Sequence, residues 1–259
     1  MRNVTGRECS LAVYTDDTYY PLPFKEETLR ETVKGYYLAS TVGCLGRGTF
    51  IKTGCRIEGC IVTRLDESSI LPIFSLIANP EKPFEVLVNR ITERKVYSGL
   101  RISSFELRAE NRGAFYFKLN LTGKYNTSAA DWDMKYPDCV WQKNRTALFN
   151  GLALEADGVK LPVIYLMSLA GSLLGIRKSK LFLHTPLQTG SVLSRAEPIG
   201  MLKLPVYGGT SLIFTSLVPE TDMTDIDCGS EILVTRRYRT EGSIIIEKVS
   251  GTGCEKVEL

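Results

Sequence analysis

The sequence has few of the features that mark a membrane-spanning, secreted or polyanion-binding protein. No run of 18 apolar residues occurs, because the longest apolar stretch, residues 161–176, is interrupted by serines and glycine. The first eight residues contain no apolar core of the kind that a signal peptide needs. Lysine and arginine number 32 against 29 acidic residues, so the formal net charge is only +3. We therefore expect a soluble protein that stays where it is made and does not bind nucleic acids strongly through its overall charge.

Histidine is also scarce, which limits catalytic chemistry. His184 is the only histidine, at the end of an apolar stretch, and it would have to serve every general-base role. No G-x-S-x-G motif is present to place a serine nucleophile beside it. We interpret His184 as a residue of a strand end or an interface.

The cysteines do not form a recognisable framework. Their number is odd, so they cannot all pair within one chain, and reduced thiols are expected. Cys55 and Cys60 are close in sequence, but no second cysteine pair or histidine cluster completes a zinc site. The seven are Cys9, Cys44, Cys55, Cys60, Cys139, Cys228 and Cys254.

The glycine-rich and charged segments lack the spacing of known sites. Residues 43–48 miss the Gly-Lys-Ser/Thr ending of a P-loop, and residues 207–210 fit a turn between two strands. The acidic stretch Glu220–Asp227 lacks the calcium-loop spacing and is interpreted as a solvated loop. In the basic run Arg236–Arg239, strand alternation separates neighbouring arginines onto opposite faces. We expect no catalytic, cofactor or metal site, and hence no enzyme.

Period-two alternation between apolar and polar residues is the dominant pattern and predicts a mainly β protein. Leu100–Ala109 and Phe115–Leu121 alternate on either side of a turn at residues 110–113, which predicts an antiparallel hairpin. Two more hairpins are predicted, Leu152–Glu155 with Val159–Ile164 around Asp157-Gly158, and Ile232–Tyr238 with Ser243–Val249 around Thr240–Gly242. Further strands are predicted at Ser10–Tyr14, Thr49–Ile57, Cys60–Arg64, Glu85–Val88, Lys180–Leu183, Met201–Val206 and Ser211–Thr215.

Helical spacing is rare. Residues Asp66–Ala78 have apolar positions at three- and four-residue spacing, a capping Asp66 or Ser68, and a following Asn79-Pro80. A second helix at Glu26–Leu38 is predicted on weaker grounds, because Gly35 and two tyrosines oppose it.

The chain divides by composition into four parts. We predict an extended N-terminal arm over residues 1–48, a strand-rich half over 49–124, a connecting segment over 125–139 and a second strand-rich half over 140–259. The motif aromatic-x-Gly-Leu occurs at Tyr97–Leu100 and again at Phe149–Leu152, which suggests an internal repeat.

The order of these features resembles that of the siphophage major tail proteins, the subunits of phage long-tail tubes. The segment Thr49–Val62 with its Gly54 and Gly59, the helix at Ser69–Ile77, and the Tyr97-Ser98-Gly99 strand pair ending at Gly123 are similar to the family's pattern. The run from Phe149 through Lys180–Leu183 to the final strands resembles its second set of strands.

The resemblance implies a β-sandwich or barrel module, possibly two in tandem, with one short helix per module. It also implies a structural virion protein, made in the cytoplasm of a host bacterium, that assembles into stacked rings around a channel through which DNA passes without specific binding. Rings would hold three copies if the chain contains two modules and six if it contains one. Terminator, tape-measure and baseplate-hub proteins would be its partners, and no membrane is involved.

Two other functions stay open at this stage. A cytosolic β-sandwich binding module, such as another virion or baseplate component or a carbohydrate binder, would use exposed aromatic residues, with Trp132 and Trp141 as candidates. A hydrolase would use carboxylates such as Asp131 and Asp133.

Overall fold

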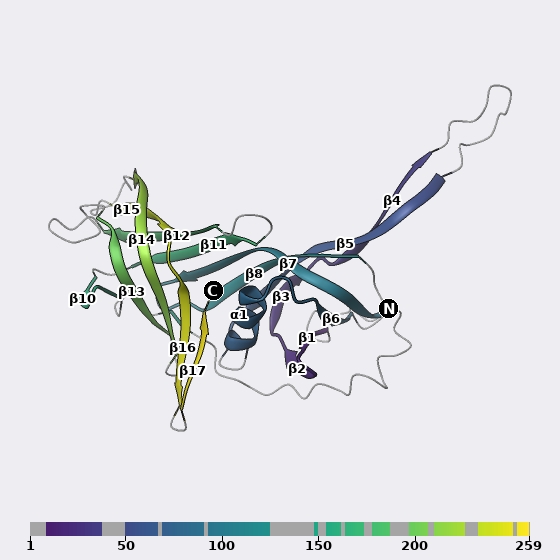
Figure 1. Cartoon of the computed structure of the whole chain (residues 1–259), viewed down its shortest axis with the longest axis horizontal. Helices are drawn as coiled ribbons and strands as arrows, with labels where there is room; N and C mark the ends of the chain where they lie inside the picture. Colours follow the sequence, from purple (N-terminus) through teal and green to yellow (C-terminus); the bar gives the residue numbers. More distant parts are fainter. Residues whose placement is uncertain are drawn as a thin grey trace, which may run out of the picture.

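A computed structural model shows a mainly antiparallel β protein with one helix among the described residues (Figure 1). The structure describes residues 9–37, 50–66, 69–90, 93–124, 148–149, 154–161, 164–173, 178–186, 197–206, 210–225, 233–250 and 253–258. The predicted mainly β class is confirmed.

The strands fall into two sets along the chain. The first set is β1 (Ser10–Thr15), β2 (Thr18–Pro21), β3 (Phe24–Glu27), β4 (Arg30–Tyr37), β5 (Phe50–Arg64), β6 (Phe84–Asn89), β7 (Arg94–Glu110) and β8 (Phe115–Gly123), with helix α1 (Ile70–Ala78) between β5 and β6. The second set is β9 (Glu155–Ala156), β10 (Val159–Lys160), β11 (Leu166–Ser172), β12 (Lys178–Pro186), β13 (Ile199–Val206), β14 (Thr210–Asp225) and β15 (Leu233–Thr240). Strands β16 (Ile244–Ser250) and β17 (Gly253–Glu258) follow.

A single sheet joins the two sets. Strands β3 and β4 lie end to end along β5, and the order then continues β8, β7, β11, β12, β15 and β14. The junction between the sets is the pair β7 and β11, in which Leu169 lies opposite Leu107. The two strand-rich halves are therefore joined by backbone pairing as well as by the intervening chain.

The second set repeats the strand pairing of the first. Strand β1 pairs with β2 and β6, β6 with β7, β7 with β8, and β8 with β5. In the same order, β9 pairs with β10 and β13, β13 with β14, β14 with β15, and β15 with β12. The pairing of β11 with β12 corresponds to that of β3 and β4 with β5. The described strands thus form two topologically equivalent modules.

Local backbone irregularities also recur at equivalent places in β7 and β14. Gly99 and Ser216 both have a positive φ, at 66° and 53°. Four residues after each of them the ladder to the next strand contains a bulge, at residue 103 against β8 and at residue 220 against β15. A left-handed residue followed four positions later by a bulge is a specific local feature, and it recurs at equivalent places in the two modules. The suggested internal repeat therefore exists as a repeat of topology.

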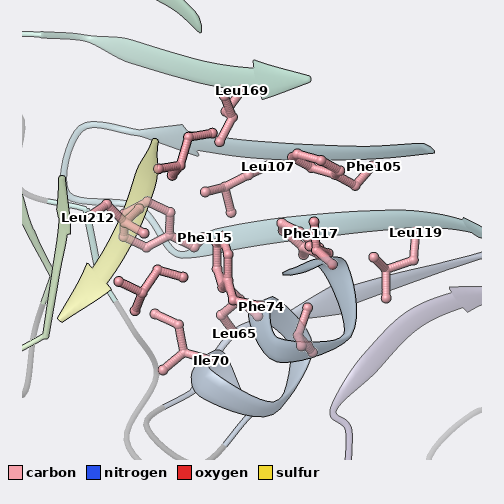
Figure 2. Close-up of a cluster of buried hydrophobic side chains, with 14 of the residues drawn as sticks. Leu65, Ile70, Phe74, Phe105, Leu107, Phe115, Phe117, Leu119, Leu169 and Leu212 are labelled. Atoms are coloured by element: carbon pink, nitrogen blue, oxygen red, sulfur yellow. The ribbon is translucent and has the colours of Figure 1, made fainter. Parts of the chain in front are cut away.

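The two modules share one hydrophobic core. Phe74 of α1 packs on Phe117 with ring centroids 5.4 Å apart, and Phe105 stacks on Phe117 at 5.8 Å. Figure 2 shows Leu169 and Leu212 of the second module in the same cluster of buried side chains. Because inward and outward positions alternate along each strand, one face of the sheet is covered by this core.

The helix that packs on the core was predicted from the sequence at Asp66–Ala78, but it begins four residues later, at Ile70. Helix α1 starts at Ile70, and Asp66 precedes it in a capping turn. The Asp66 carboxylate accepts a hydrogen bond from the Ser69 backbone N–H at 2.8 Å, and the Ser69 hydroxyl accepts one from the Asp66 N–H at 3.0 Å. The segment between β12 and β13, where a second module's helix would stand, lies outside the described residues, so one helix per module stays a prediction.

Two local predictions were wrong. In the helix predicted at Glu26–Leu38, the described residues 26–37 are not helical, because β3 and β4 pair with β5 there, where β-forming Val33, Tyr36 and Tyr37 extend along the ladder. Residues 232–249 do not form a hairpin either. Strands β15 and β16 lie one after the other along the same side of β14, and the Glu241–Ser243 segment between them opposes residues 215 and 216.

The remaining strand predictions fared better. The hairpin of β7 and β8 is confirmed, with Arg112 at φ 61° in its turn. The Asp157-Gly158 hairpin is confirmed as the short pair β9 and β10, and the strands predicted at 49–57 and 60–64 merge into the continuous β5. Strands β2, β11 and β17 were not predicted. The connecting segment 125–139 lies outside the described residues, so that boundary stays a prediction. Of the predicted arm over residues 1–48, residues 10–37 form β1–β4 of the first module, and Leu11, Val13 and Leu22 lie in the core.

Candidate functional site

The most distinctive surface feature is the two-stranded ribbon formed by β4 and the first half of β5. Strand β5 pairs with β8 only from Ile57 onward, so residues 50–56 pair with β4 alone among the described strands. The ribbon projects away from the rest of the sheet (Figure 1). A free two-stranded ribbon is marginally stable in water. Contact with another molecule would supply the packing that it lacks.

Large apolar side chains are exposed on this ribbon. Tyr36, Tyr37 and Phe50 are 54%, 72% and 43% exposed, and Val33 is similarly open. The rings of Tyr37 and Phe50 contact each other, with centroids 5.1 Å apart. Aromatic residues that remain exposed in a cluster are typical of protein interfaces, where they bury large area with little loss of conformational freedom. We call residues 30–37 and 50–56 the ribbon from here on.

A charged cluster holds the root of the ribbon, where β3 passes into β4. The Arg90 guanidinium donates to both carboxylate oxygens of Glu27, from Nε at 2.9 Å and from Nη2 at 2.8 Å. It also donates to the Leu29 carbonyl at 2.9 Å, and the Tyr97 hydroxyl donates to the same carbonyl at 3.1 Å. We call Glu27, Leu29, Arg90 and Tyr97 the root clamp.

Burial and charge act in opposite directions on this cation. Burial disfavours the charged form of Arg90, but the hydrogen bonds and charge of Glu27 outweigh it, and the pKa of Arg90 stands above its ordinary value. The Glu27 side chain is only 4% exposed, so its carboxylate depends on Arg90 and on the Leu29 N–H for its hydrogen bonds. The clamp therefore fixes the backbone at Leu29 with side-chain partners.

Among the described strands, β2, β10 and β17 each pair with one strand only, and two further open edges lie at the ends of the strand order that joins the modules. Strands β3 and β4 have no described strand partner on the side away from β5, and residues 218–225 of β14 have none on the side away from β15. Open edges invite pairing with another chain, so proteins either protect them or use them in assembly.

The face of the sheet away from the core is polar and carries both cations and acids. Lys118 lies opposite Glu106 in the ladder between β8 and β7. Lys180 donates to Glu220 at 2.9 Å, and this hydrogen bond holds the pKa of Glu220 below its ordinary value. Residues Glu220–Asp225 belong to strand β14. For these residues the interpretation of Glu220–Asp227 as a solvated loop was therefore wrong.

The basic run in β15 follows the expected alternation. Arg236 is buried, whereas the Arg237 guanidinium lies over the Phe182 ring, 5.0 Å from its centroid. Arg239 shares the face of Arg237 and lies opposite Lys180. The sequence did not reveal this neighbourhood of cations because it forms across strands, and only the register of β12 against β15 shows it.

His184 lies within β12, half-buried, with Nδ1 2.9 Å from the Thr235 hydroxyl. Cys55 hydrogen-bonds Glu31, and Cys60 lies near the Thr28 hydroxyl, so the two thiols have separate partners. Within the described part of the chain, no three His, Cys, Asp or Glu side chains come together as metal ligands would. Asp131, Asp133, Trp132, Trp141 and residues 43–48 lie outside the described residues.

A pocket of about 270 Å³ lies near the junction of β15 and β16. Phe105, Ser179, Thr240 and Ile244 contribute to its walls, and Ser179 and Thr240 hydrogen-bond each other there. Among its described lining residues the aromatic one is Phe105, which is buried in the core.

No described helix is long and apolar enough to cross a membrane. A comparison with protein-family models and with curated proteins finds no match to this chain.

Proposed function

We propose that this chain is the tube subunit of a long-tailed phage or prophage, a structural virion protein that assembles into stacked rings. The projecting ribbon with exposed Tyr36, Tyr37 and Phe50 carries the proposal, because it is a surface with no counterpart on the rest of the described chain. A ribbon that docks on a different surface of a neighbouring copy makes a heterologous contact. Such contacts propagate into open tubes.

The polar face of the sheet supports a channel role. Two of its cations lie in the ion pairs Lys180–Glu220 and Arg108–Glu110, at 2.9 Å and 3.6 Å. Acids that partner cations in this way weaken the hold of a wall on the phosphate backbone, compared with a wall of unpaired basic side chains. On this proposal the protein is made in the bacterial cytoplasm and resides in the virion tail. DNA passes through its channel, and terminator, tape-measure and baseplate-hub proteins meet the tube.

Negative-stain electron microscopy of the purified full chain tests the proposal. Rings or hollow tubes at high protein concentration are expected. The variant Tyr36→Ser/Tyr37→Ser should lose tubes while keeping the melting temperature of the wild type, because both side chains lie in solvent.

Tyr165→Ser is the matched control, since Tyr165 is exposed but lies off the ribbon. It should leave tubes intact. Monodisperse monomers of wild-type protein at every concentration would contradict the proposal.

A further inference from the structure

We infer that the junction between the two modules is the template for the contact between neighbouring copies. Inside the chain, β11 pairs with the part of β7 that has left β6, with Ser168 opposite Arg108 and Ala170 opposite Glu106. In the second module the equivalent part of β14 has an open edge. In the first module the strands equivalent to β11, which are β3 and β4, also have an open edge. The open edge of β14 in one copy can therefore pair with the open edge of β3 and β4 in the next copy.

The register of this contact follows from the equivalence of the modules. Ser104 and Thr221 each follow the bulge and pair with Asn120 and Arg237. Asn120 lies opposite Cys60, and Arg237 lies opposite Phe182, so Cys60 and Phe182 are equivalent.

The strands that flank β5 and β12 on their other side give the last equivalence that the register needs. The Thr28 N–H donates to the Cys60 carbonyl, and Ser168 lies opposite Phe182, which makes Thr28 equivalent to Ser168. Since Ser168 lies opposite Arg108, four residues after Ser104, Thr28 of one copy is placed opposite Asp225 of the next. Two residues further along, Arg30 is placed opposite Met223.

The root clamp occupies one position of this edge. Leu29 is equivalent to Leu169, which pairs with β7 through its backbone. In the first module the Leu29 backbone groups are satisfied by Glu27, Arg90 and Tyr97 instead. Met167 occupies the place of Glu27 in β11, where the edge is already paired. A charged cap thus occurs on the open edge and is absent from its paired equivalent, as expected of edge protection.

The root clamp also limits the length of the proposed ladder between two copies. Because side chains already satisfy Leu29, the contact runs from Arg30 toward Thr32 against Met223 to Thr221. In this register Glu31 is placed opposite Asp222, so charge does not select the contact, and the equivalence of β3 and β4 with β11 is what supports it. The partner is a second copy of this chain, joined edge to edge in a ring.

This inference rests on the proposed tube function and gives it a ring of tandem modules. Single variants Arg30→Cys and Met223→Cys are made in a chain whose seven native cysteines are replaced by serine, then purified, mixed under assembly conditions and oxidised, so that a disulfide can form only between chains. Antiparallel partners have Cα atoms about 4.5–5.5 Å apart, which a disulfide can span. We expect a covalent dimer from the mixture. The double variant should give a ladder of bands that ends at the closed ring, at three copies for two modules per chain.

The control mixture is Glu31→Cys with Met223→Cys. A one-residue shift puts the two side chains on opposite faces of the sheet, so in the same chain without native cysteines no covalent dimer is expected. Rings or tubes without the covalent dimer linked through residues 30 and 223 would overturn the edge pairing but would still support the tube function. The same dimer without rings or tubes would support the edge pairing and count against the tube function.

Discussion

Replacing Arg90 with methionine removes the cation of the root clamp and keeps most of the side chain's length. Glu27 then keeps its carboxylate in a nearly closed site with the Leu29 N–H as its remaining partner in the clamp. Tyr97 and the Leu29 carbonyl still bond each other at 3.1 Å, so the loss is concentrated on Glu27. Removing one member of a buried ion pair costs 3–5 kcal/mol, and the 31% exposure of Arg90 favours the lower end, about 3 kcal/mol.

Urea unfolding of the full chain, followed by circular dichroism, measures this loss. A loss of about 3 kcal/mol corresponds to a fall in melting temperature of roughly 6–12 °C for a chain of this size. The double variant Glu27→Gln/Arg90→Met should recover about 1–2 kcal/mol of it, because no carboxylate is then left without its cation.

Arg101→Met is the matched control. Arg101 pairs with Glu81 at 3.4 Å, but both side chains are half or more exposed, so the expected loss is below about 1 kcal/mol. If Arg90→Met and Arg101→Met destabilise the protein equally, the clamp does not hold the ribbon root and the reasoning fails.

Three further predictions concern the core and the backbone. Phe117→Ala should lower the free energy of unfolding by about 3–5 kcal/mol, measured in urea, because the ring is fully buried between Phe74 and Phe105; a smaller loss would mean that the core refills the space. Gly59→Ala should cost about 1–3 kcal/mol in the same assay, since its Cβ would lie 2.5 Å from the Thr28 carbonyl oxygen, and an unchanged midpoint would refute that close approach. Gly99→Ala should cost about 1 kcal/mol through its positive φ alone, because no atom lies near the added methyl group, and a neutral result in thermal unfolding would show that the strand relaxes there.

Alternation and turn chemistry were enough to predict the hairpin of β7 and β8. Its inward residues are apolar, its outward residues are polar, and its turn residues tolerate a positive φ at Arg112. The same reasoning failed at residues 232–249. A Gly-containing segment between two apolar runs can be a hairpin turn or a break between collinear strands, and the partner strand β14 decides between them. That information is not local.

The repeat was suspected from the wrong residues. Tyr97–Leu100 lies in β7, whereas Phe149 precedes β9, so the two aromatic-x-Gly-Leu motifs are not equivalent. The equivalent of Gly99 is Ser216, which has the same backbone conformation with a different side chain. Sequence comparison within one chain cannot find an equivalence that persists in backbone geometry after the residue types have changed.

The ribbon was hidden from the sequence for a similar reason. Its alternation resembles that of other strands, and residues 26–38 even permitted a helix. The ribbon begins where β8 stops pairing with β5, at Ile57. This boundary depends on where β8 ends, which the sequence of the ribbon itself does not show. The exposed tyrosines could be recognised as surface residues only after that boundary was known.

The two modules differ in one respect that affects any assembly built from them. The first module extends β4 and β5 into a ribbon, whereas the equivalent β11 ends at Ser172. A ring of three such chains would have six module positions but only three ribbons, at every second position. The ribbon contacts between successive rings would then have threefold symmetry, although the wall of each ring is pseudo-sixfold. Duplication within one chain would thus allow half of the modules to specialise in connecting rings while the other half only complete the wall.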